Sequence, residues 1–327
     1  LPSSMEALVC QAHGEPPEMA LAAAPVPTPK EGQVLIAVEA AGISYVDNLM
    51  VRNLHQNKHP TPFSPGMEVA GRVVAVGPGV AGLTEGRLVA ALVYDGGHAP
   101  YAVANASETF PLPRGCDPVR AAALLSVALT ADLALGERAR VAPGESVLVG
   151  GAAGGVGLCA VQLARRMGAH VIAAASDETR CAFAKAAGAH EALTYGAGFR
   201  ERFRALNGER DADVVIDPVG GAFAEEAANL LEWDGRYVVV GFAGRKIPTF
   251  AANRLLVKNR AVLGMVLGYY RWQKPIVLRA AAERVLAAIA EGALDGPLTV
   301  VEGLGAVPAI MGRIADRQLL GKAVVTL

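Results

Sequence analysis

Apolar and polar positions follow different spacings in different parts of the chain. From residue 5 to about residue 120, short apolar runs such as GQVLIAVEAAGIS and MEVAGRVVAVGPGV are bounded by glycine and proline. Runs of this length between turn-forming residues are typical of β-strands. We therefore expect this part of the chain to form a compact β-domain.

Between about residue 125 and residue 267, strand-like and helix-like segments alternate. SVLVGG precedes the apolar-striped VGLCAVQLARRMG, and DVVIDPVGG precedes FAEEAANLLEWDG, for which we expect a helix. Three glycines directly follow predicted helices, where a left-handed residue often ends a helix: Gly168, Gly188 and Gly235. The alternation predicts a parallel, doubly wound sheet of the Rossmann type.

The last segment, residues 268–327, contains a predicted helix around VLRAAAERVLAAIAEGAL and a short terminal strand, KAVVTL. We expect this strand to rejoin the first domain. The predicted fold is thus α/β, with a β-domain of residues 5–124 completed by 268–327, and a nucleotide-binding domain of residues 125–267. The segment LPSS before Met5 is interpreted as a cloning remnant outside the fold.

Composition narrows the classes of partner. The 327 residues are 52% hydrophobic and 19% charged, with a formal net charge of −1 and no basic block, so we expect neither nucleic acid nor an anionic membrane as partner. The apolar run AAALLSVALTADLALG is interrupted by Asp132 and is predicted to be too short for a membrane span. The four cysteines form no CxxC pair, which argues against a disulfide framework and favours a reducing, cytoplasmic location.

A glycine-rich turn joins the first predicted strand of the second domain to its first helix. It reads Ala152–Ala153–Gly154–Gly155–Val156–Gly157, so an alanine replaces the first glycine of GxGxxG. The first N–H groups of a helix lack partners and carry partial positive charge, which suits a pyrophosphate where no side chain blocks its approach. We expect Gly154 and Gly155 to supply bare backbone and Gly157 to permit close packing; a turn needed only for packing is the alternative.

The end of the next predicted strand bears on the choice between NAD and NADP. An acidic residue there usually binds the ribose hydroxyls of NAD, whereas this chain has Ala174, Ala175 and Ser176, followed by Arg180. A hydroxyl and a guanidinium suit a 2′-phosphate, so the pattern favours NADPH. The nearby Asp177 would weaken that preference, although it is also a good helix N-cap.

Several motifs together resemble the zinc-free NADPH:quinone reductases related to zeta-crystallin, within the medium-chain dehydrogenases/reductases. The resemblance covers the chain from Met5 and rests on AAGISYVD, PFSPGMEVAGRVVAVGPGV, LTADLAL, AAGGVG, DPVGG and VVVGFAG. It implies a GroES-like β-domain beside a Rossmann domain, a small-molecule quinone or enone as substrate, and a homodimer formed through the sheet edge at RAVLGMVLG.

The resemblance also argues against a bound metal ion. Zinc-dependent relatives carry their ligands at positions occupied here by Ser44, Met67 and Ser126. A hydroxyl or thioether is a poor substitute for thiolate or imidazole on Zn²⁺, so we expect no metal site. His55 and His59 have a ligand-like spacing, but the surrounding polarity and Pro60 indicate a solvated loop.

The resemblance further implies the site residues. Tyr45, Asp47 and His55 are the candidate catalytic residues. His55, like Leu49, occupies a position where such relatives often carry a tyrosine. The alternatives are a core aromatic for Tyr45, a turn carboxylate for Asp47 and a solvated loop histidine for His55. The candidate cofactor-binding residues are Thr130, Ala153, Gly154, Gly155, Val156, Ser176, Arg180, Tyr195, Gly241, Phe242, Ala243, Met265 and Lys322. A surface lysine is the alternative for Lys322, and Asp217 is interpreted as a loop cap.

These observations predict a zinc-independent NADPH oxidoreductase that reduces quinones or related conjugated carbonyls by direct hydride transfer. Two alternatives stay open: an enoyl-thioester reductase and a non-catalytic, crystallin-like NADPH-binding protein. The first would need a basic patch for a phosphate of its substrate. Arg254, Lys258 and Arg260 could form one, although such runs are usually solvated faces.

Overall fold

The computed structural model describes residues 1–327 and divides the chain into two compact units. One unit, called here the β-domain, comprises residues 1–126 and 273–327, and the other, the nucleotide-binding domain, comprises residues 127–272. These limits lie a few residues from the predicted ones.

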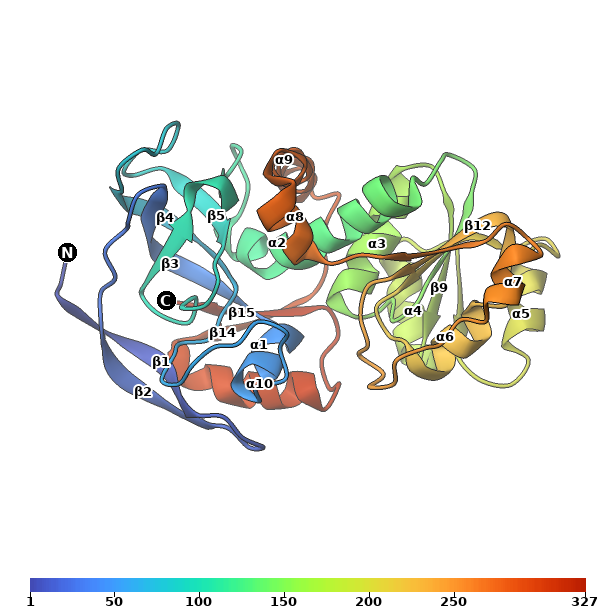
Figure 1. Ribbon diagram of the computed structural model, residues 1–327, viewed down its shortest axis with the longest axis horizontal. Coiled ribbons are helices and arrows are strands. Elements are labelled where there is room, and N and C mark those ends of the chain that lie inside the picture. Colours follow the sequence, from blue (N-terminus) through green and yellow to red (C-terminus); the bar gives the residue numbers. More distant parts are fainter. The chain divides into compact units, whose positions relative to one another are not determined.

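The nucleotide-binding domain is built on a six-stranded sheet in which every neighbouring pair is parallel. Its spatial order is β10-β9-β8-β11-β12-β13, the doubly wound order that reverses direction between β8 and β11. Figure 1 shows helices on the faces of this sheet. The strands are β8 (Ser146–Val149), β9 (His170–Ala175), β10 (Glu191–Thr194), β11 (Ala212–Asp217), β12 (Leu231–Val239) and β13 (Ala261–Gly264). The predicted Rossmann fold is confirmed.

Helices precede or follow the strands of this sheet along the chain. They are α3 (Gly155–Arg166), α4 (Glu178–Ala186), α5 (Phe199–Leu206), α6 (Gly221–Ala227), α7 (Ala252–Leu256) and α8 (Leu267–Gln273), the last of which reaches the domain limit. Gly168 and Gly188, after α3 and α4, have φ angles of 81° and 120°, as predicted.

The third predicted helix end is wrong. Helix α6 stops at Ala227, and LEWDG belongs to β12, in which Asp234 and not Gly235 has a positive φ, of 57°. Leu231 is paired with Ala212 of β11, and the Ala212 amide donates to the Leu230 carbonyl. Pairing with β11 therefore makes this segment a strand, although its local apolar spacing alone predicts that α6 continues through it.

The β-domain contains a seven-stranded sheet and a separate hairpin. The sheet order is β14-β15-β3-β4-β5-β7, with β6 also paired to β3. Its strands are β3 (Gln33–Ile43), β4 (Glu68–Val76), β5 (Leu88–Leu92), β6 (Tyr101–Asn105), β7 (Thr109–Pro111), β14 (Leu298–Glu302) and β15 (Lys322–Thr326). The terminal strand β15 is antiparallel to β3, which confirms that the C-terminal segment rejoins this domain.

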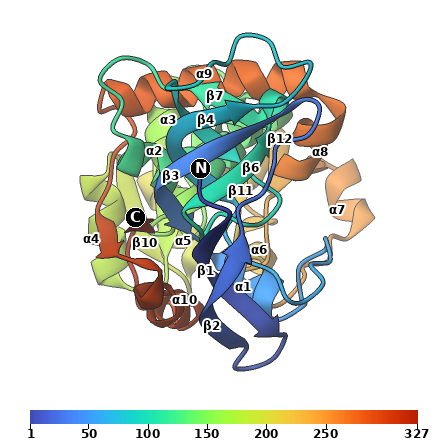
Figure 2. The same cartoon turned by 90° about the vertical axis from the view of Figure 1, so that its left-hand side faces the viewer.

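The hairpin of β1 (Ser4–Ala12) and β2 (Glu18–Pro25) faces the viewer in Figure 2. Ser4 is paired with Pro25, and the Val26 amide donates to the Ser3 carbonyl. The expectation that LPSS lies outside the fold is therefore wrong, because two of its residues extend this hairpin.

Four further helices complete the chain: α1 (Tyr45–Val51), α2 (Pro118–Asp132), α9 (Pro275–Ala290) and α10 (Val307–Ala315). Helix α2 runs directly into a π-helical segment, η2 (Leu133–Ala139), so Asp132 does not end the helix. The continuous helix Pro118–Ala139 is long and apolar enough to cross a membrane by length and composition, contrary to the sequence expectation. However, 67% of its most apolar window is buried inside the fold, as is typical of a core helix.

Candidate functional site

The glycine-rich turn between β8 and α3 leaves its backbone uncovered. Gly154 is exposed and forms the N-cap of α3 without a side-chain cap, while Ala153 is buried and Gly155 and Val156 are half-buried. A Cβ atom on Gly157 would lie 2.3 Å from the carbonyl oxygen of Gly151, so the helix packs against the turn at distances that only glycine allows. The structure therefore places an uncapped helix N-terminus at the end of the first strand, where an anion can approach the N–H groups.

Two earlier glycines also shape this turn, and the sequence reasoning missed them. A Cβ atom on Gly150 would lie 2.4 Å from the ring of Phe223, and Gly151 has a φ of 56°. The Gly151 amide donates to the Tyr195 hydroxyl over 2.8 Å, and that hydroxyl lies 3.2 Å from the Ala174 carbonyl oxygen. Tyr195, predicted to lie beside an adenosine phosphate, thus holds the turn to the end of β9; the paired glycines of VLVGG were the available signal.

The end of β9 carries the charged groups that bear on cofactor choice. Asp177 caps α4 by accepting the Arg180 amide at 2.9 Å, as predicted, and it also accepts the Arg180 guanidinium at 2.7 Å and the Ser176 hydroxyl at 2.9 Å. The bond from the Arg180 amide, followed by the side-chain bonds, lowers the pKa of Asp177. Ser176 and Arg180 are therefore brought together as predicted, but around a carboxylate with which a phosphate would compete.

A buried carboxylate holds the loop that follows β11 and connects it to β12. Asp217 is fully buried and accepts the amides of Val219 at 2.7 Å and Gly220 at 2.8 Å, and it accepts the Tyr237 hydroxyl at 2.6 Å. Burial raises the pKa of Asp217. Its predicted role as a loop cap is confirmed, because both carboxylate oxygens hold groups of the fold itself.

Three of the predicted cofactor-binding residues lie on the loop after β12, whose backbone is hydrogen-bonded to the end of β11 and the loop after it. Gly241 and Ala243 donate their amides to the carbonyls of Asp217 and Pro218, and the side chain of Phe242 is exposed. Met265 follows β13, is buried, and donates its amide to Val239. Thr130 lies half-buried on α2. None of these contacts assigns a ligand to any of these residues, and their cofactor roles stay predictions.

In the β-domain, the buried carboxylate of Asp47 fixes the start of α1. Its Oδ2 accepts the amide of Ser44 at 2.7 Å and its hydroxyl at 3.0 Å, and its Oδ1 accepts the Gly66 amide at 3.1 Å. Asp47 is fully buried, whereas the neighbouring Tyr45 is exposed. The structure thus gives Asp47 a positioning role between α1 and the Gly66 loop, and its catalytic role is a prediction that no contact supports.

A buried ion pair lies close to the positions where zinc-dependent relatives place ligands. The Lys322 ammonium donates to Glu68 over 3.0 Å, and both side chains are almost completely buried. The other Glu68 oxygen accepts the Ser126 amide at 2.8 Å. Lys322 is therefore not the surface lysine of the alternative interpretation: it compensates the charge of Glu68, which accounts for its burial without a cofactor.

Three aromatic or imidazole rings surround His59, which is buried, contrary to the expectation of a solvated loop. Its Nδ1 lies 3.1 Å from Asp95, so Nδ1 carries the hydrogen, because an ionised carboxylate only accepts. Ring centroids lie 4.6 Å away in Tyr94, 5.3 Å away in Phe63 and 5.7 Å away in His55. The Nε2 atom of His59 is buried without a hydrogen-bond partner.

His55 stacks on this buried ring at an interplanar angle of 25°. It is half-buried, and its Nδ1 also lacks a hydrogen-bond partner. Burial, followed by the neighbouring His59, lowers the pKa of His55. A lowered pKa favours the neutral form of the imidazole. Asp95, His59 and His55 thus form a connected group, called here the histidine cluster.

The two domains together define a class of protein. A parallel sheet in this order, with an uncapped glycine turn after its first strand, is the architecture of dinucleotide-binding domains. No group of three or more His, Cys, Asp or Glu side chains is arranged to hold a metal ion. The chain is thus a two-domain protein of the dinucleotide-dependent dehydrogenase/reductase class.

Comparison with known proteins identifies the family within this class. Residues 30–114 match a family model described as alcohol dehydrogenase GroES-like domain, and residues 155–283 match one described as zinc-binding dehydrogenase. Quinone oxidoreductase-like protein 2 of Bos taurus is 35% identical over 297 residues, which cover 90% of this chain and 85% of that protein. Human quinone oxidoreductase is 33% identical over 246 residues, 74% of either chain.

A solved structure shares the whole fold. The quinone oxidoreductase of Thermus thermophilus, determined alone and in complex with NADPH, superimposes with a TM-score of 0.83 at 37% identity, covering 99% of this chain and 100% of that one. The chain belongs to the quinone oxidoreductase family of the medium-chain dehydrogenases/reductases, a family of oxidoreductases.

Proposed function

We propose that this protein uses NADPH to reduce quinones or related conjugated carbonyls by direct hydride transfer, without a metal ion. The observation that carries the proposal is the uncapped N-terminus of α3 beside the strand end that holds Ser176 and Arg180. The NADPH complex of the Thermus thermophilus relative supports the same cofactor.

The residues at this edge fit the groups of NADPH. Gly154 and Gly155 would leave room for the pyrophosphate, and the Gly155 amide at the helix start would bind it, since the Gly154 amide already donates to the Gly151 carbonyl at 2.8 Å. A side chain at Gly157 would displace this turn. Ser176 and Arg180 would bind the 2′-phosphate, with Arg180 exchanging part of its bond to Asp177 for one to the phosphate. Because Arg180 has to give up part of its bond with Asp177, we expect only a moderate preference for NADPH over NADH.

When bound, NADPH supplies a hydride to a conjugated acceptor that can delocalise the arriving charge. The protein has to orient the acceptor, exclude water and provide one proton to the acceptor oxygen. We propose His55 as the donor of that proton or of a hydrogen bond, because its half-buried ring is stacked on His59, which is hydrogen-bonded to Asp95. With Ser44, Met67 and Ser126 at the ligand positions of zinc-dependent relatives, no metal is needed for this acceptor class.

The test is the oxidation of NADPH, with NADH as control, against an ortho-quinone and an α,β-unsaturated thioester side by side, before and after dialysis against a chelator. Quinone-dependent oxidation that survives the chelator, with NADPH ahead of NADH, is the expected result. Turnover of the thioester alone would replace the proposal by the enoyl-thioester alternative. Tight NADPH binding without turnover of either acceptor would replace it by the binding role.

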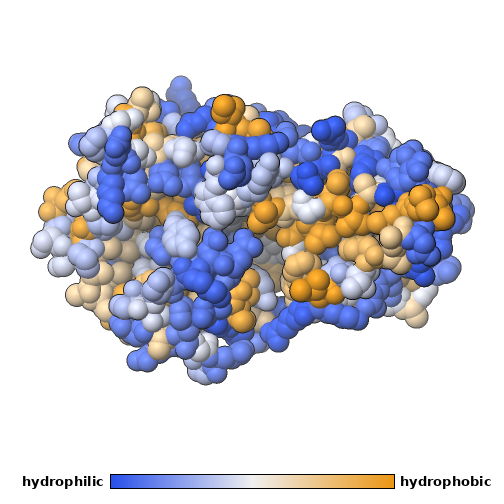
Figure 3. Space-filling model, viewed as in Figure 1, coloured by the Kyte–Doolittle hydropathy of each residue, from blue (hydrophilic) through white to orange (hydrophobic).

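We also propose a homodimer formed at the β13 edge of the sheet. Strand β13 is the last in the sheet order, and three large apolar residues near it are exposed: Leu256, Val257 and Val266. Figure 3 shows hydrophobic side chains gathered over this part of the nucleotide-binding domain. Light scattering should give twice the mass of the chain, and a Val257→Glu variant should give one copy.

A further inference from the structure

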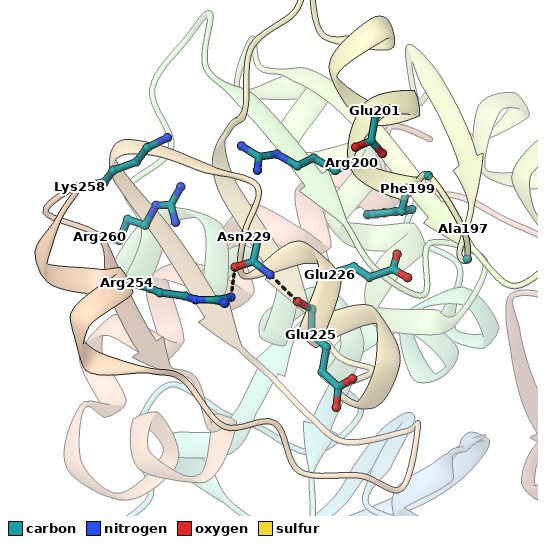
Figure 4. A pocket seen from close by; sticks show the side chains of 12 residues that line it. Ala197, Phe199, Arg200, Glu201, Glu225, Glu226, Asn229, Arg254, Lys258 and Arg260 are labelled. Atoms are coloured by element: carbon teal, nitrogen blue, oxygen red, sulfur yellow. Dashed lines mark hydrogen bonds between the residues drawn. The ribbon is translucent and has the colours of Figure 1, made fainter.

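A groove in the nucleotide-binding domain brings several basic side chains together at one place in its lining. It has a volume of about 660 Å³ and lies between the N-terminus of α5, the C-terminal half of α6, and α7 with the segment that follows it (Figure 4). Four basic side chains lie in one part of it: Arg200, Arg254, Lys258 and Arg260. None of the residues at the glycine turn or at the end of β9 lines the groove.

One buried carboxylate serves two of these cations. Asp211 lies 3.2 Å from the Arg200 guanidinium and 3.4 Å from the Lys258 ammonium, and it also attracts Arg204 at 3.8 Å. These three cations thus share one buried carboxylate, which anchors Arg200 and Lys258 at the base of the groove.

The other two arginines have neutral partners. Arg254 donates to the amide oxygen of Asn229, and Arg260 donates to the backbone carbonyl of Leu231. The Nε atom of Arg260 is buried without a hydrogen-bond partner. Burial lowers the pKa of Arg260, and Arg200 and Arg254 lower it further against the opposing effect of Asp211 and Glu232. Like charges are therefore crowded at this point, where a bound anion would stabilise them.

Three glutamates also line the groove: Glu201, which follows Arg200 on α5, and Glu225 and Glu226 on α6. Glu225 forms an ion pair with Lys246, which does not line the groove. Glu226 interacts with the backbone of Gly196, and one of its carboxylate oxygens is buried without a hydrogen-bond partner. Burial raises the pKa of Glu226, against the opposing effect of Gly196 and Arg202. In Figure 4 the carboxylates of Glu225 and Glu226 lie apart from the guanidinium of Arg260.

We propose that this groove is a second phosphate-binding site, separate from the cofactor edge, for a phosphorylated small molecule that carries a pyrophosphate or a phosphate ester. Guanidinium groups bind phosphate oxygens in pairs, and Arg254 and Arg260 can exchange their neutral partners for such bonds. Asp211 keeps Arg200 and Lys258 in place for the same ligand. The site does not depend on the hydride chemistry proposed above.

Calorimetric titration with pyrophosphate tests the site on the whole protein, in the presence and absence of NADPH. We expect saturable binding that persists with NADPH and weakens as salt is added. The double variant Arg254→Gln/Arg260→Gln should bind at least about tenfold more weakly, since each charge-assisted contact is removed. Arg210→Gln, which removes an exposed arginine outside the groove, is the matched control and should bind as the parent does.

Asn229→Asp is a second variant that keeps both arginines and places a carboxylate between them and α6. It should also weaken pyrophosphate binding, and thermal melting should show that each variant is folded. Equal affinity of the parent and the double variant, an absence of binding at millimolar pyrophosphate, or complete displacement by NADPH would each overturn the proposal.

Discussion

The two domains present their functional groups in different ways. The cofactor edge of the nucleotide-binding domain is made of backbone: Gly154 is bare, and Gly157 and Gly150 are glycines because a Cβ atom would collide with the fold. The β-domain instead buries charged and titratable side chains, in the Glu68–Lys322 pair and in the histidine cluster. A backbone site tolerates almost no added atom, whereas a buried side-chain site tolerates no unpaired charge.

The largest effect is therefore expected where a buried charge loses its partner. Lys322→Met removes the ammonium but keeps much of the apolar stem, and Glu68 is left buried with only the Ser126 amide as donor. Such a change costs about 4 kcal/mol of unfolding free energy, because the remaining carboxylate has no compensation. Urea unfolding of the variant and the parent measures the difference.

The control removes both charges. Glu68→Gln/Lys322→Met should recover most of the lost stability, since neither partner is then charged and unpaired. If the single and the double variant are equally unstable, the loss comes from packing and not from charge, and the contrast between the domains is weaker than proposed.

The backbone site should respond to a single added side chain. Gly157→Val adds a Cβ atom only 2.3 Å from the carbonyl oxygen of Gly151, so the turn has to move. We expect the free energy of unfolding to fall by about 3 kcal/mol. We also expect NADPH binding to become too weak to measure. Gly136→Ala is the matched control, because a Cβ atom there meets nothing within 4 Å. NADPH fluorescence and thermal melting should leave this control unchanged; an equal loss in both variants would contradict the steric account.

The same contrast decides what the sequence could reveal. The glycine turn and the strand order follow from local patterns, so the Rossmann fold and the residues Gly154 to Gly157 could be predicted. The ion pair joins residues 254 positions apart in sequence, and the pairing of His59 with Asp95 joins residues 36 apart. Nothing local marks Lys322 as buried or His59 as surrounded by rings, so those clusters became visible only in the structure.

The histidine cluster should matter for turnover if His55 provides the proton. Removing a general acid typically costs about a hundredfold in rate, so His55→Ala should lower kcat with the quinone by about that factor while NADPH binding is unchanged. Asp95→Asn should shift the pH profile of kcat without abolishing activity, because Asp95 acts through His59. Parent values of kcat and KM in His55→Ala would remove His55 from the mechanism.

At the cofactor edge, Arg180 is expected to contribute a smaller, selective effect. Arg180→Gln removes one charge-assisted bond to the 2′-phosphate and should reduce the ratio of NADPH to NADH efficiency by about tenfold. Asp177→Asn, which keeps an N-cap oxygen but frees the guanidinium, should raise the same ratio. Steady-state kinetics with both cofactors give the ratios. A change of the same sign in both variants would show that the helix start, and not the phosphate contact, is being measured.

The smallest expected effect is the acid dependence of stability that comes from one histidine in each domain. Burial lowers the pKa of His55, aided by His59 and Lys58 and opposed by Asp47, and burial also lowers the pKa of His190. As the pH falls through the ordinary histidine pKa, the unfolded chain therefore binds more protons than the native protein. The free energy of unfolding is highest above that pKa and decreases as the pH falls below it. His55→Asn and His190→Asn should each flatten the fall of Tm between about pH 7 and pH 5 relative to the parent. For His190, the Val171 amide donates to Nδ1 over 3.0 Å, so protonation would also break this bond. Calorimetric melting curves that stay parallel to those of the parent over this range would show that neither ring is held neutral by the fold.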